Sequence, residues 1–541
     1  MTDTDTAPPP PPPAPHPPLP PLRALAYMAA ATVIGLAQGL QQGIVSTSLP
    51  QIAGDLGITT TTAAWLLAIY MIPRAALPVM LIKIRTQFGL RRFAEIGIIA
   101  YAAVALASIW TVDFRSALIL QMLAGMAAAP LSTLAFLYML EPLSPQAKMV
   151  LGLPLALVVL MAGPSLARVV GPSLIGDGGL AAVHLTGLGL ALVSLMLVFL
   201  LPLRPVPRQK VIAPMDFVSF LLIGAGFGGL IVAGVMGPIY NWTDVAWIGW
   251  TLAGSVAALA LAGAVELNRR APLLDIRWLA SPAILHLTGT LFLFRLILSE
   301  QSAGAPRMFQ VLGVAPEQMT GLFAVILTAS LLGALACIAW MRPHRVAGFH
   351  LVALLMIAAG AALDAGASMD TRPAQMIVSQ ALIGFAAMLF MPPAMMTGLI
   401  AALSRGPQYI LSFVIVFIST QSLGGVLGSG LFTTLTTWRQ AAHLQELSAH
   451  LSAADPITAR ALAGRAAQLA AQTPDAAARM GQAGSELAAR ASAQAWVSAY
   501  NDIYALTAVA ALLAAALLML HLLRDALAPR AAATPDTGTR P

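Results

Sequence analysis

Long apolar stretches follow one another along most of the chain, separated by short segments that hold its charged residues and prolines. Each stretch stays apolar over about 20 residues, the length that an α-helix needs to cross a bilayer. None shows the strict alternation of a barrel strand. We therefore predict an all-α integral membrane protein with fourteen spanning helices, the ninth interrupted by Arg295. The predicted spans are 24–46, 62–82, 93–112, 116–139, 149–171, 180–202, 214–237, 245–265, 283–299, 320–341, 347–366, 374–400, 409–434 and 499–523.

The composition supports this prediction and narrows the function. Of the 541 residues, 58% are apolar and 9% are charged, whereas soluble proteins average about 45–50% and about 25%. This excludes a soluble enzyme, a nucleic-acid binder and a disordered scaffold. The single cysteine, Cys337, excludes a disulfide framework and a cysteine metal site. No phosphate-binding loop, metal-spaced histidine pair or nucleophile elbow occurs, so we expect no cofactor, no metal and no ATP-driven step.

Basic residues are distributed unevenly between the loops on the two sides. With the N-terminus inside, 18 of the 29 Lys and Arg residues fall in cytoplasmic segments, whereas the short external loops hold only Arg115, Arg307 and Arg372. A positive-inside bias of this kind orients membrane proteins, so we expect both termini in the cytoplasm. The net charge of +7, which first suggests a nucleic-acid partner, is thereby explained largely by topology.

Three segments lie outside the predicted spans. Residues 1–23 hold eleven prolines and are expected to form a disordered cytoplasmic tail, and residues 524–541 form a second cytoplasmic tail. The external loop 435–498 is rich in Ala, Gln and spaced Arg or Glu. We expect two or three short helices there, with breaks at Pro456 and Pro474, and favour a polar connection over a surface that docks on the membrane or a partner.

Three arginines remain inside predicted spans after topology is accounted for: Arg74, Arg168 and Arg295. Charged groups within spans are costly and usually mark a pathway, a partner or a substrate site. Together these arginines would make a cavity attractive to an organic anion. The alternative is that each one pairs with a carboxylate or with carbonyls at a helix end.

Carboxylates are scarcer than arginines in the spans. Glu300 follows Arg295 by five residues and is interpreted either as its salt-bridge partner or as a proton-titrating site. Glu95 and Asp364 are interpreted as interface residues, since they lie at the ends of spans. No carboxylate falls at the centre of a predicted span.

Uncharged polar and small residues add a weaker signal. Gln41 and Gln42 of the first span, Gln121, Gln380 and Gln421 can bind a substrate or hydrogen-bond between helices. The methionines around Met391 form an adaptable apolar patch. The four-residue spacing of Gly35, Gly39 and Gly43, and of Gly424 and Gly428, predicts close helix packing. Gly171 and Pro172, followed by Gly176, suggest a kink or a sliding contact.

The order of these motifs resembles the major facilitator superfamily, and within it the fourteen-helix drug:proton antiporter branch of the EmrB/QacA type. The segments that carry the resemblance are VSTSLPQIAGDLG, WLLAIY, LIKIRTQFGLRR, GPSLARVVGPSLIG, PMDFVSFLLIGAG, ELNRRAPLLDIRWL, PRMFQVLGVAPEQMTGLF and LTTWRQAAHLQELSAHLSAADP. Two departures stand out. Gln41 replaces an acidic residue common in the family's first span, and Gln121 replaces the arginine of its fourth-span motif.

The resemblance implies two six-helix halves, 24–203 and 280–523, around a central cavity, with two additional helices at 214–266. It also implies a bacterial inner-membrane exporter that works by alternating access and an external loop that docks a periplasmic adaptor. The expected substrates are amphipathic drugs or aromatic compounds, and the departures favour anionic or neutral ones. The alternatives are a non-transporting sensor or scaffold and an exporter of one natural metabolite.

Site residues are expected as follows. Substrate is expected to contact Gln41, Gln42, Tyr70, Arg74, Gln121, Arg295, Met391 and Gln421. Glu300 is the candidate for proton coupling, and the conformational motif comprises Arg168, Gly171, Pro172 and Gly176.

Overall fold

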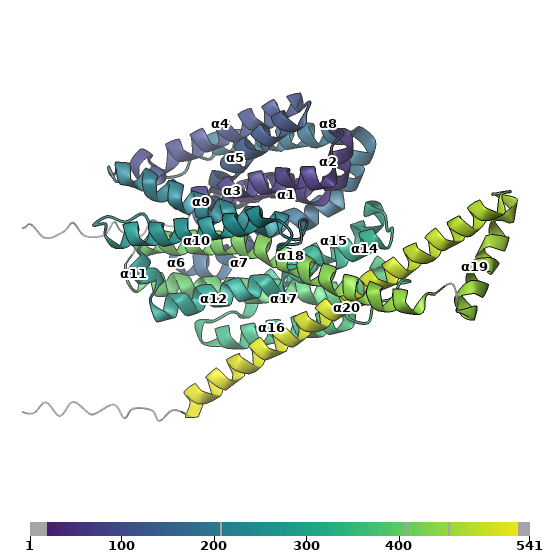
Figure 1. Ribbon diagram of the computed structural model, residues 1–541. Coiled ribbons are helices and arrows are strands. Elements are labelled where there is room, and N and C mark those ends of the chain that lie inside the picture. The colour runs from purple at the N-terminus through teal and green to yellow at the C-terminus, as the bar shows by residue number, and fades with distance from the viewer. Residues whose placement is uncertain (1–18, 206–207, 407, 453–454, 528–541) are drawn as a thin grey trace, which may run out of the picture. The chain divides into compact units, whose positions relative to one another are not determined.

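The computed structural model describes residues 19–205, 208–406, 408–452 and 455–527, and all regular secondary structure in these ranges is helical (Figure 1). Most of the predicted N-terminal tail and residues 528–541 of the C-terminal tail lie outside the described residues. Within them, 13 helices are long and apolar enough to cross a membrane, and a bent pair, Pro145–Met161 with Gly163–Gly176, raises the number to 14. The predicted all-α chain with fourteen spans is confirmed.

The chain divides into two compact units. Unit 1 comprises residues 1–167, 173–228 and 259–275, and unit 2 comprises residues 168–172, 229–258 and 276–541. The helices of unit 1 are α1 (Pro21–Thr47), α2 (Leu49–Asp55), α3 (Thr60–Phe88), α4 (Leu90–Ala107), η1 (Ser108–Trp110), α5 (Phe114–Leu140), α6 (Pro145–Ala147), the π-helix η2 (Lys148–Gly152) and α7 (Leu153–Met161).

Three helices contribute residues to both units, and the remainder belong to unit 2. The shared helices are α8 (Gly163–Leu200), α9 (Pro214–Met236) and α10 (Ala246–Leu267). The helices of unit 2 are α11 (Ile276–Leu279), α12 (Pro282–Ile297), α13 (Ser299–Ala303), α14 (Ala305–Val311), η3 (Pro316–Met319), α15 (Thr320–Trp340), η4 (Pro343–Arg345), α16 (Val346–Asp364), η5 (Pro373–Met376), α17 (Ile377–Leu403), α18 (Gln408–His450), α19 (Pro456–Gln468), η6 (Leu469–Ala471) and α20 (Ala476–Leu527).

Local sequence signals explain where several helices begin and end. Asp113 caps α5 by accepting a hydrogen bond from the Ser116 backbone N–H at 2.9 Å, and Ser116 completes a capping box. Hydrogen bonds from Ser116 hold the pKa of the Asp113 carboxyl below its ordinary value. Gly89 separates α3 from α4 at a φ of +85°, a conformation that glycine adopts without strain.

The glycine stripe of α1 packs as its spacing predicts. A Cβ atom at Gly163 would lie 2.5 Å from the Gly39 carbonyl oxygen, and one at Gly43 would lie 2.5 Å from the Ala167 Cβ. Only hydrogen fits at these positions, so the backbones of α1 and the start of α8 lie in direct contact. In unit 2, a Cβ at Gly428 of α18 would lie 2.1 Å from Ser299 Oγ. Both glycine pairs therefore serve helix packing.

The break in the fifth span lies elsewhere than expected. Pro172 stands inside α8, whereas the chain bends by 40° between α7 and α8. A second departure from helical geometry occurs at Gly179, whose φ is +59°. The bends in this segment lie at Ala162 and Gly179 rather than at Pro172, because a proline within the helix can be accommodated and a glycine frees the backbone locally. The sliding contact that Gly171 and Pro172 also suggest stays a prediction.

The segment expected to be an external loop is largely helical. α18 continues to residue 450 and α20 begins at residue 476 and runs for 52 residues, so most of 435–498 consists of the ends of two long helices. Figure 1 shows α20 as one uninterrupted rod with α19 packed beside its start. Ala, Gln, Glu and Arg favour helix, which explains why two helices extend where short ones were expected. Pro456 and Pro474 mark breaks, as predicted.

Ion pairs join the two long helices of unit 2. Asp502 of α20 accepts from Arg439 Nε at 2.6 Å and contacts His443 Nε2 at 2.7 Å. Glu486 of α20 pairs with Arg465 of α19. These contacts hold the projecting helices in register.

Candidate functional site

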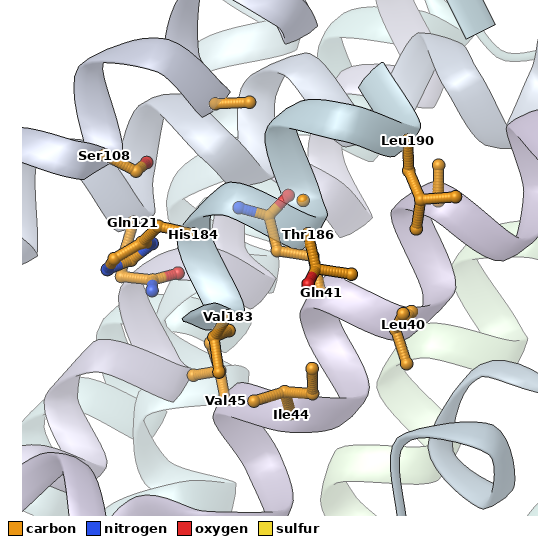
Figure 2. Close-up of a pocket in the computed structure, with 13 residues that line it drawn as sticks. Leu40, Gln41, Ile44, Val45, Ser108, Gln121, Val183, His184, Thr186 and Leu190 are labelled. Carbon is orange, nitrogen blue, oxygen red and sulfur yellow. The ribbon is translucent and has the colours of Figure 1, made fainter. Parts of the chain in front are cut away.

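Unit 1 contains a pocket lined by residues of α1, α4, η1, α5 and α8 (Figure 2). Its polar lining consists of the Gln41 and Gln121 amides, the His184 ring and the Ser108 and Thr186 hydroxyls. The remaining lining is apolar: Ala37, Leu40, Ile44, Val45, Ala105, Val183, Gly187 and Leu190. A few polar groups within an apolar wall are typical of small-molecule sites. Of the predicted substrate residues, Gln41 and Gln121 lie here.

The two amides of this pocket differ in how they are satisfied. Gln41 Oε1 accepts a hydrogen bond from the Tyr101 hydroxyl at 3.0 Å, and the same hydroxyl lies 3.0 Å from the Ala37 carbonyl. Gln121 Oε1 is buried and has no partner among the residues that the structure describes. The pocket therefore keeps an open acceptor at Gln121. Tyr101, which holds Gln41, was not singled out from sequence because a tyrosine within an apolar run carries no positional signal.

A second polar group of unit 1 lies where α3 contacts α5. Arg74 Cζ lies 5.9 Å from the centre of the Tyr70 ring, and the buried Arg74 Nη1 and Tyr70 hydroxyl lack hydrogen-bond partners within the described ranges. The α5 backbone touches this turn, since a Cβ at Gly125 would lie 2.1 Å from the Tyr70 carbonyl oxygen. Gln121 precedes Gly125 by one helical turn and shares its face. The structure thus brings Tyr70 and Arg74 together and places the α5 backbone against the Tyr70 turn.

Gln42, another predicted substrate residue of unit 1, makes one weak side-chain contact. Its Nε2 lies 3.4 Å from the Met71 sulfur. A thioether is a poor acceptor, so the amide remains available for stronger hydrogen bonds.

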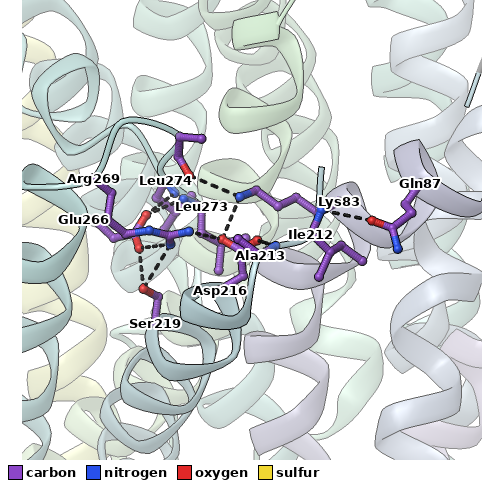
Figure 3. A network of polar contacts seen from close by, with 11 residues as sticks. Lys83, Gln87, Ile212, Ala213, Asp216, Ser219, Glu266, Arg269, Leu273 and Leu274 are labelled. Carbon is purple, nitrogen blue, oxygen red and sulfur yellow. Dashed lines mark hydrogen bonds and ion pairs between the residues drawn. The ribbon is translucent and has the colours of Figure 1, made fainter. Parts of the chain in front are cut away.

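A four-member charge network ties α3 to α9 and the end of α10 within unit 1 (Figure 3). Asp216 accepts from Lys83 Nζ at 2.6 Å and from Arg269, which also donates to Glu266 at 2.6 Å. Glu266 further accepts from the Ser219 hydroxyl and the backbone N–H of residues 273 and 274. Both carboxylates are fully buried, and two positive charges balance two negative ones. The sequence interpretation treated Lys83 and Arg269 as topology charges and overlooked Asp216 and Glu266.

Unit 2 also contains an arginine within a predicted span, Arg295, near a polar side chain that lacks hydrogen-bond partners among the described residues. Its side chain packs against α18, where a Cβ at Gly425 would lie 3.1 Å from Arg295 Nη2. Arg295 Nε is buried without a hydrogen-bond partner in the part of the chain that the structure describes, and the same holds for both amide atoms of Gln421. Gln421 lies one turn before Gly425 on α18, so the two side chains share one region.

The predicted salt bridge between Arg295 and Glu300 is absent from the described residues. Five residues advance a helix by about 140°, so the two side chains leave on different faces. The chain also breaks between α12, which ends at residue 297, and α13, which begins at residue 299. Arg295 consequently faces α18, whereas Glu300 faces α17.

Glu300 belongs instead to a buried polar cluster with α16 and α17. Gln380 Nε2 donates to Asp364 Oδ2 at 2.6 Å and lies 3.4 Å from Glu300 Oε1. The Ser379 hydroxyl donates to Asp364 Oδ1. Asp364 is 2% exposed, and its interpretation as a residue at the membrane interface stays a prediction. It ends a hydropathy segment, but α17 covers it.

The remaining predicted residues have ordinary surroundings. Arg168 Cζ lies 4.7 Å from the centre of the Phe323 ring, and Nη2 donates to the Ser302 carbonyl at 3.5 Å. Ser302 lies in the last turn of α13, so Arg168 matches the alternative of a helix-end partner. Met391 is fully buried in α17, next to Phe390, which stacks on Phe294 with ring centres 3.8 Å apart.

Comparison with known proteins identifies the fold. No family model matches the chain. Among curated proteins, it is 23% identical over 269 residues to the fatty acid resistance protein FarB of Neisseria gonorrhoeae, a match that covers 48% of this chain and 51% of FarB. The chain thus matches about half the length of that relative.

Solved structures match over much more of the chain. The human organic anion transporter MFSD10 aligns with a TM-score of 0.54 and 12% identity, covering 91% of this chain and 100% of MFSD10. A bacterial homologue of the lysosomal transporter Spinster aligns with a TM-score of 0.51 and 14% identity, over 93% and 97%. The proton:xylose symporter XylE, a major facilitator superfamily protein, aligns with a TM-score of 0.52 and 14% identity, over 78% and 91%. These neighbours are carriers rather than enzymes, and the chain has their fold.

Proposed function

With the major facilitator fold as the premise, we propose that this protein is a secondary active transporter that exports lipophilic organic anions across the bacterial inner membrane. Export proceeds by alternating access and is driven by protons, with both termini in the cytoplasm. The observation that carries this proposal is that Arg74 in unit 1 and Arg295 in unit 2 each hold one buried guanidinium nitrogen, Nη1 and Nε respectively, that lacks a hydrogen-bond partner within the described ranges.

An unbalanced buried arginine is costly, so its retention needs a reason. A charge in a span is unfavourable by about 2.5–3.5 kcal/mol even on the most lenient scale. The same chain neutralises Arg269 with two carboxylates, which shows that it can pair an arginine where only structure is required. A substrate anion that arrives during the cycle would supply the missing charge at Arg74 or at Arg295.

The groups around each arginine suit an amphipathic anion. In unit 1 the Tyr70 ring lies beside Arg74, and in unit 2 Gln421 stands one helical turn before Gly425, which Arg295 contacts. Gln121 and Gln421 each hold a buried amide atom without a hydrogen-bond partner among the described residues. A carboxylate can accept two hydrogen bonds from one guanidinium group, while the apolar walls take a hydrocarbon or aromatic body. A fatty acid has this chemistry, and the name of the relative FarB supports that substrate class.

Transport by matched substrates tests the proposal. Purified protein in liposomes is offered an aryl carboxylate, its neutral amide and the corresponding amine. We expect the carboxylate to be transported in preference. Preference for the amine would overturn the anion assignment, and no flux of any compound would favour a non-transporting role.

Two substitutions assign that preference to the arginines. Hydrogen bonds to a charged group contribute about 1.5–3 kcal/mol, so Arg74→Gln and Arg295→Gln should each reduce carboxylate transport by about 10- to 100-fold. Amide transport should change little. Arg91→Gln, which removes an exposed arginine paired with Glu95, is the matched control and should leave all three fluxes unchanged.

The proposal also includes membership of the EmrB/QacA branch and a periplasmic adaptor as partner. The fourteen predicted spans and the segment LTTWRQAAHLQELSAHLSAADP support the EmrB/QacA branch, and the projecting ends of α18 and α20 with α19 offer a surface for a periplasmic adaptor. Deletion of residues 440–490 should abolish export from intact cells while leaving flux in liposomes intact. Unchanged cellular export would argue against the adaptor.

A further inference from the structure

Two buried carboxyl groups of unit 2 lie side by side. The single nitrogen Nε2 of Gln380 contacts Asp364 Oδ2 at 2.6 Å and Glu300 Oε1 at 3.4 Å, so one amide spans both acids. Glu300 and Gln380 are fully buried, and Asp364 nearly so. Glu300 Oε2 and Gln380 Oε1 have no hydrogen-bond partner among the residues described. The cluster is therefore closed to solvent and incompletely satisfied.

Among the described residues no cation is paired with either acid, and Arg168, which reaches α13, donates through Nη2 to the Ser302 carbonyl of that helix at 3.5 Å. On α12, Arg295 packs against α18, and on α14, Arg307 donates to Thr433 of α18 at 2.6 Å. On α20, the Tyr504 ring lies against α13, since a Cβ at Gly304 would lie 2.5 Å from the Glu300 carbonyl oxygen and 2.7 Å from Tyr504 Cε1. The Tyr504 hydroxyl contacts the Met308 sulfur at 3.9 Å. From α17 and α18 the neighbouring polar groups are neutral: Ser379, Gln380 and Ser429. Two adjacent carboxylates cannot both remain ionised in such surroundings.

We propose that Glu300 and Asp364 together hold one proton, and that binding and release of this proton couples the transport cycle to the pH gradient. The inference rests on the proposed function, because a coupling proton has meaning only in a transporter. The chemistry is limited to one bond: an O–H bond forms on a Glu300 oxygen when the proton binds and breaks when the proton returns to water.

The hydrogen bonds assign the proton to one member of the pair. Asp364 accepts on both oxygens, from the Ser379 hydroxyl and from Gln380. Such donors favour the ionised form of a carboxyl group. Glu300 receives one long contact on Oε1 and none on Oε2. Glu300 is accordingly the protonated carboxylic acid and Asp364 the carboxylate that keeps the proton nearby.

The position of Glu300 on a short helix explains how a change in its charge would move that helix. It lies on the five-residue helix α13, which is separated from α12 at residue 298 and from α14 at Gly304, where the backbone leaves helical geometry at φ −86° and ψ −97°. Proton loss places two negative charges around Gln380, and their repulsion pushes α13 away from α16 and α17. A short segment with a break at each end can shift without unfolding the long helices.

Transport in liposomes with and without a pH gradient tests the proposal. For Glu300→Gln and Asp364→Asn, we expect pH-driven accumulation of the carboxylate probe to be lost, while exchange of labelled for unlabelled probe at equal pH is retained. Exchange needs the substrate site and conformational change but no net proton movement. Glu95→Gln, which removes a carboxyl at the start of α4, is the matched control and should keep both activities.

A readout that needs no transport separates this inference from the proposed function. Infrared difference spectra between acidic and alkaline buffer should contain the band of a protonated carboxyl, and that band should vanish in Glu300→Gln. If the band vanishes but no variant or wild type moves substrate, the proton site stands and the transport proposal fails. If pH-driven transport survives in Glu300→Gln and the band is unchanged, the proton site is overturned. A sodium gradient that replaces the pH gradient as driver would also overturn it.

Discussion

Among the residues whose burial is described, each unit buries two carboxyl groups, and the surroundings of the two pairs are opposite in charge balance. In unit 1, Asp216 and Glu266 meet Lys83 and Arg269, and hydrogen bonds from Ser219 and three backbone amides complete the network. In unit 2, Glu300 and Asp364 share one amide, and no cation is paired with them among the described residues. The first arrangement balances its charge permanently, whereas the second needs a proton from outside.

The comparison separates structural charge from functional charge. A buried network with equal numbers of opposite charges has nothing to gain from another ion, so it holds helices together. A buried pair of like charges changes its net charge whenever one proton moves. Burial of a charged side chain therefore does not by itself identify a functional residue, and the count of partners is more informative. The same reasoning separates Arg269 from Arg74 and Arg295.

The largest expected effect comes from breaking the balanced network. Asp216→Asn leaves Lys83 and Arg269 with one carboxylate between them. Removing one partner of a buried ion pair typically costs about 3–5 kcal/mol. We expect a strongly lowered melting temperature and loss of monodisperse protein in detergent, measured by thermal unfolding and size exclusion. A melting temperature equal to that of the wild type would show that the network is not structural.

A double-mutant cycle measures the coupling between Lys83 and Asp216, and its expected effect on stability is smaller. Lys83→Gln combined with Asp216→Asn removes one charge of each sign, so the pair should be less destabilised than the sum of its single variants. Contacting groups usually show coupling of about 0.5–3 kcal/mol. Unfolding of the four proteins in one detergent gives this energy. Strict additivity would mean that the two side chains act independently.

Substitution in the carboxyl pair of unit 2, Glu300 and Asp364, should change the melting temperature only slightly. Glu300→Gln replaces a carboxyl that already carries a proton and that makes one long contact. Its stability should change by less than about 1 kcal/mol, the net contribution of an ordinary hydrogen bond. Thermal unfolding checks this alongside the transport assay. A loss as large as that of Asp216→Asn would erase the contrast between the two units.

The smallest effect on the melting temperature is expected at an exposed ion pair, which serves as the reference for the buried ones. Arg91 Nε lies 2.8 Å from Glu95 Oε1, with side chains 61% and 25% exposed. Helical pairs of this spacing contribute about 0.3–0.5 kcal/mol, so Glu95→Gln should leave the melting temperature almost unchanged. A clear shift would indicate that detergent or salt, rather than burial, governs the other results.

The membrane helices could be predicted from the sequence because hydropathy is a local property. The predicted span 214–237 corresponds to α9 at Pro214–Met236, and 245–265 corresponds to α10 at Ala246–Leu267. The close packing of Gly39 was predicted for the same reason, since glycines four residues apart define one helix face. These features depend on residues close together in the chain.

Pairings between distant residues could not be predicted. Lys83 and Asp216 are 133 positions apart, and Glu300 and Gln380 are 80 apart. The apolar segments that separate them contain nothing that specifies register against another helix. The place of Asp364 at the end of a predicted span indicates how deep it lies but not that α17 covers it. The sequence indicated Arg74, Gln121, Arg295 and Glu300 as site residues, whereas the side chains around them, such as Gln380 beside Glu300, came from the structure.

The 52 residues of α20 also have a mechanical consequence. At 1.5 Å per residue this helix is about 80 Å long, whereas the hydrocarbon core of a bilayer is about 30 Å thick. The apolar residues 499–523 and the more polar residues 476–498 form two parts of nearly equal length, about 35 Å each. A tilt of a few degrees within the membrane becomes a displacement of several ångströms at the far end, where α19 is attached. A partner bound at this end of α20 would therefore be displaced when the membrane-spanning part of the helix tilts.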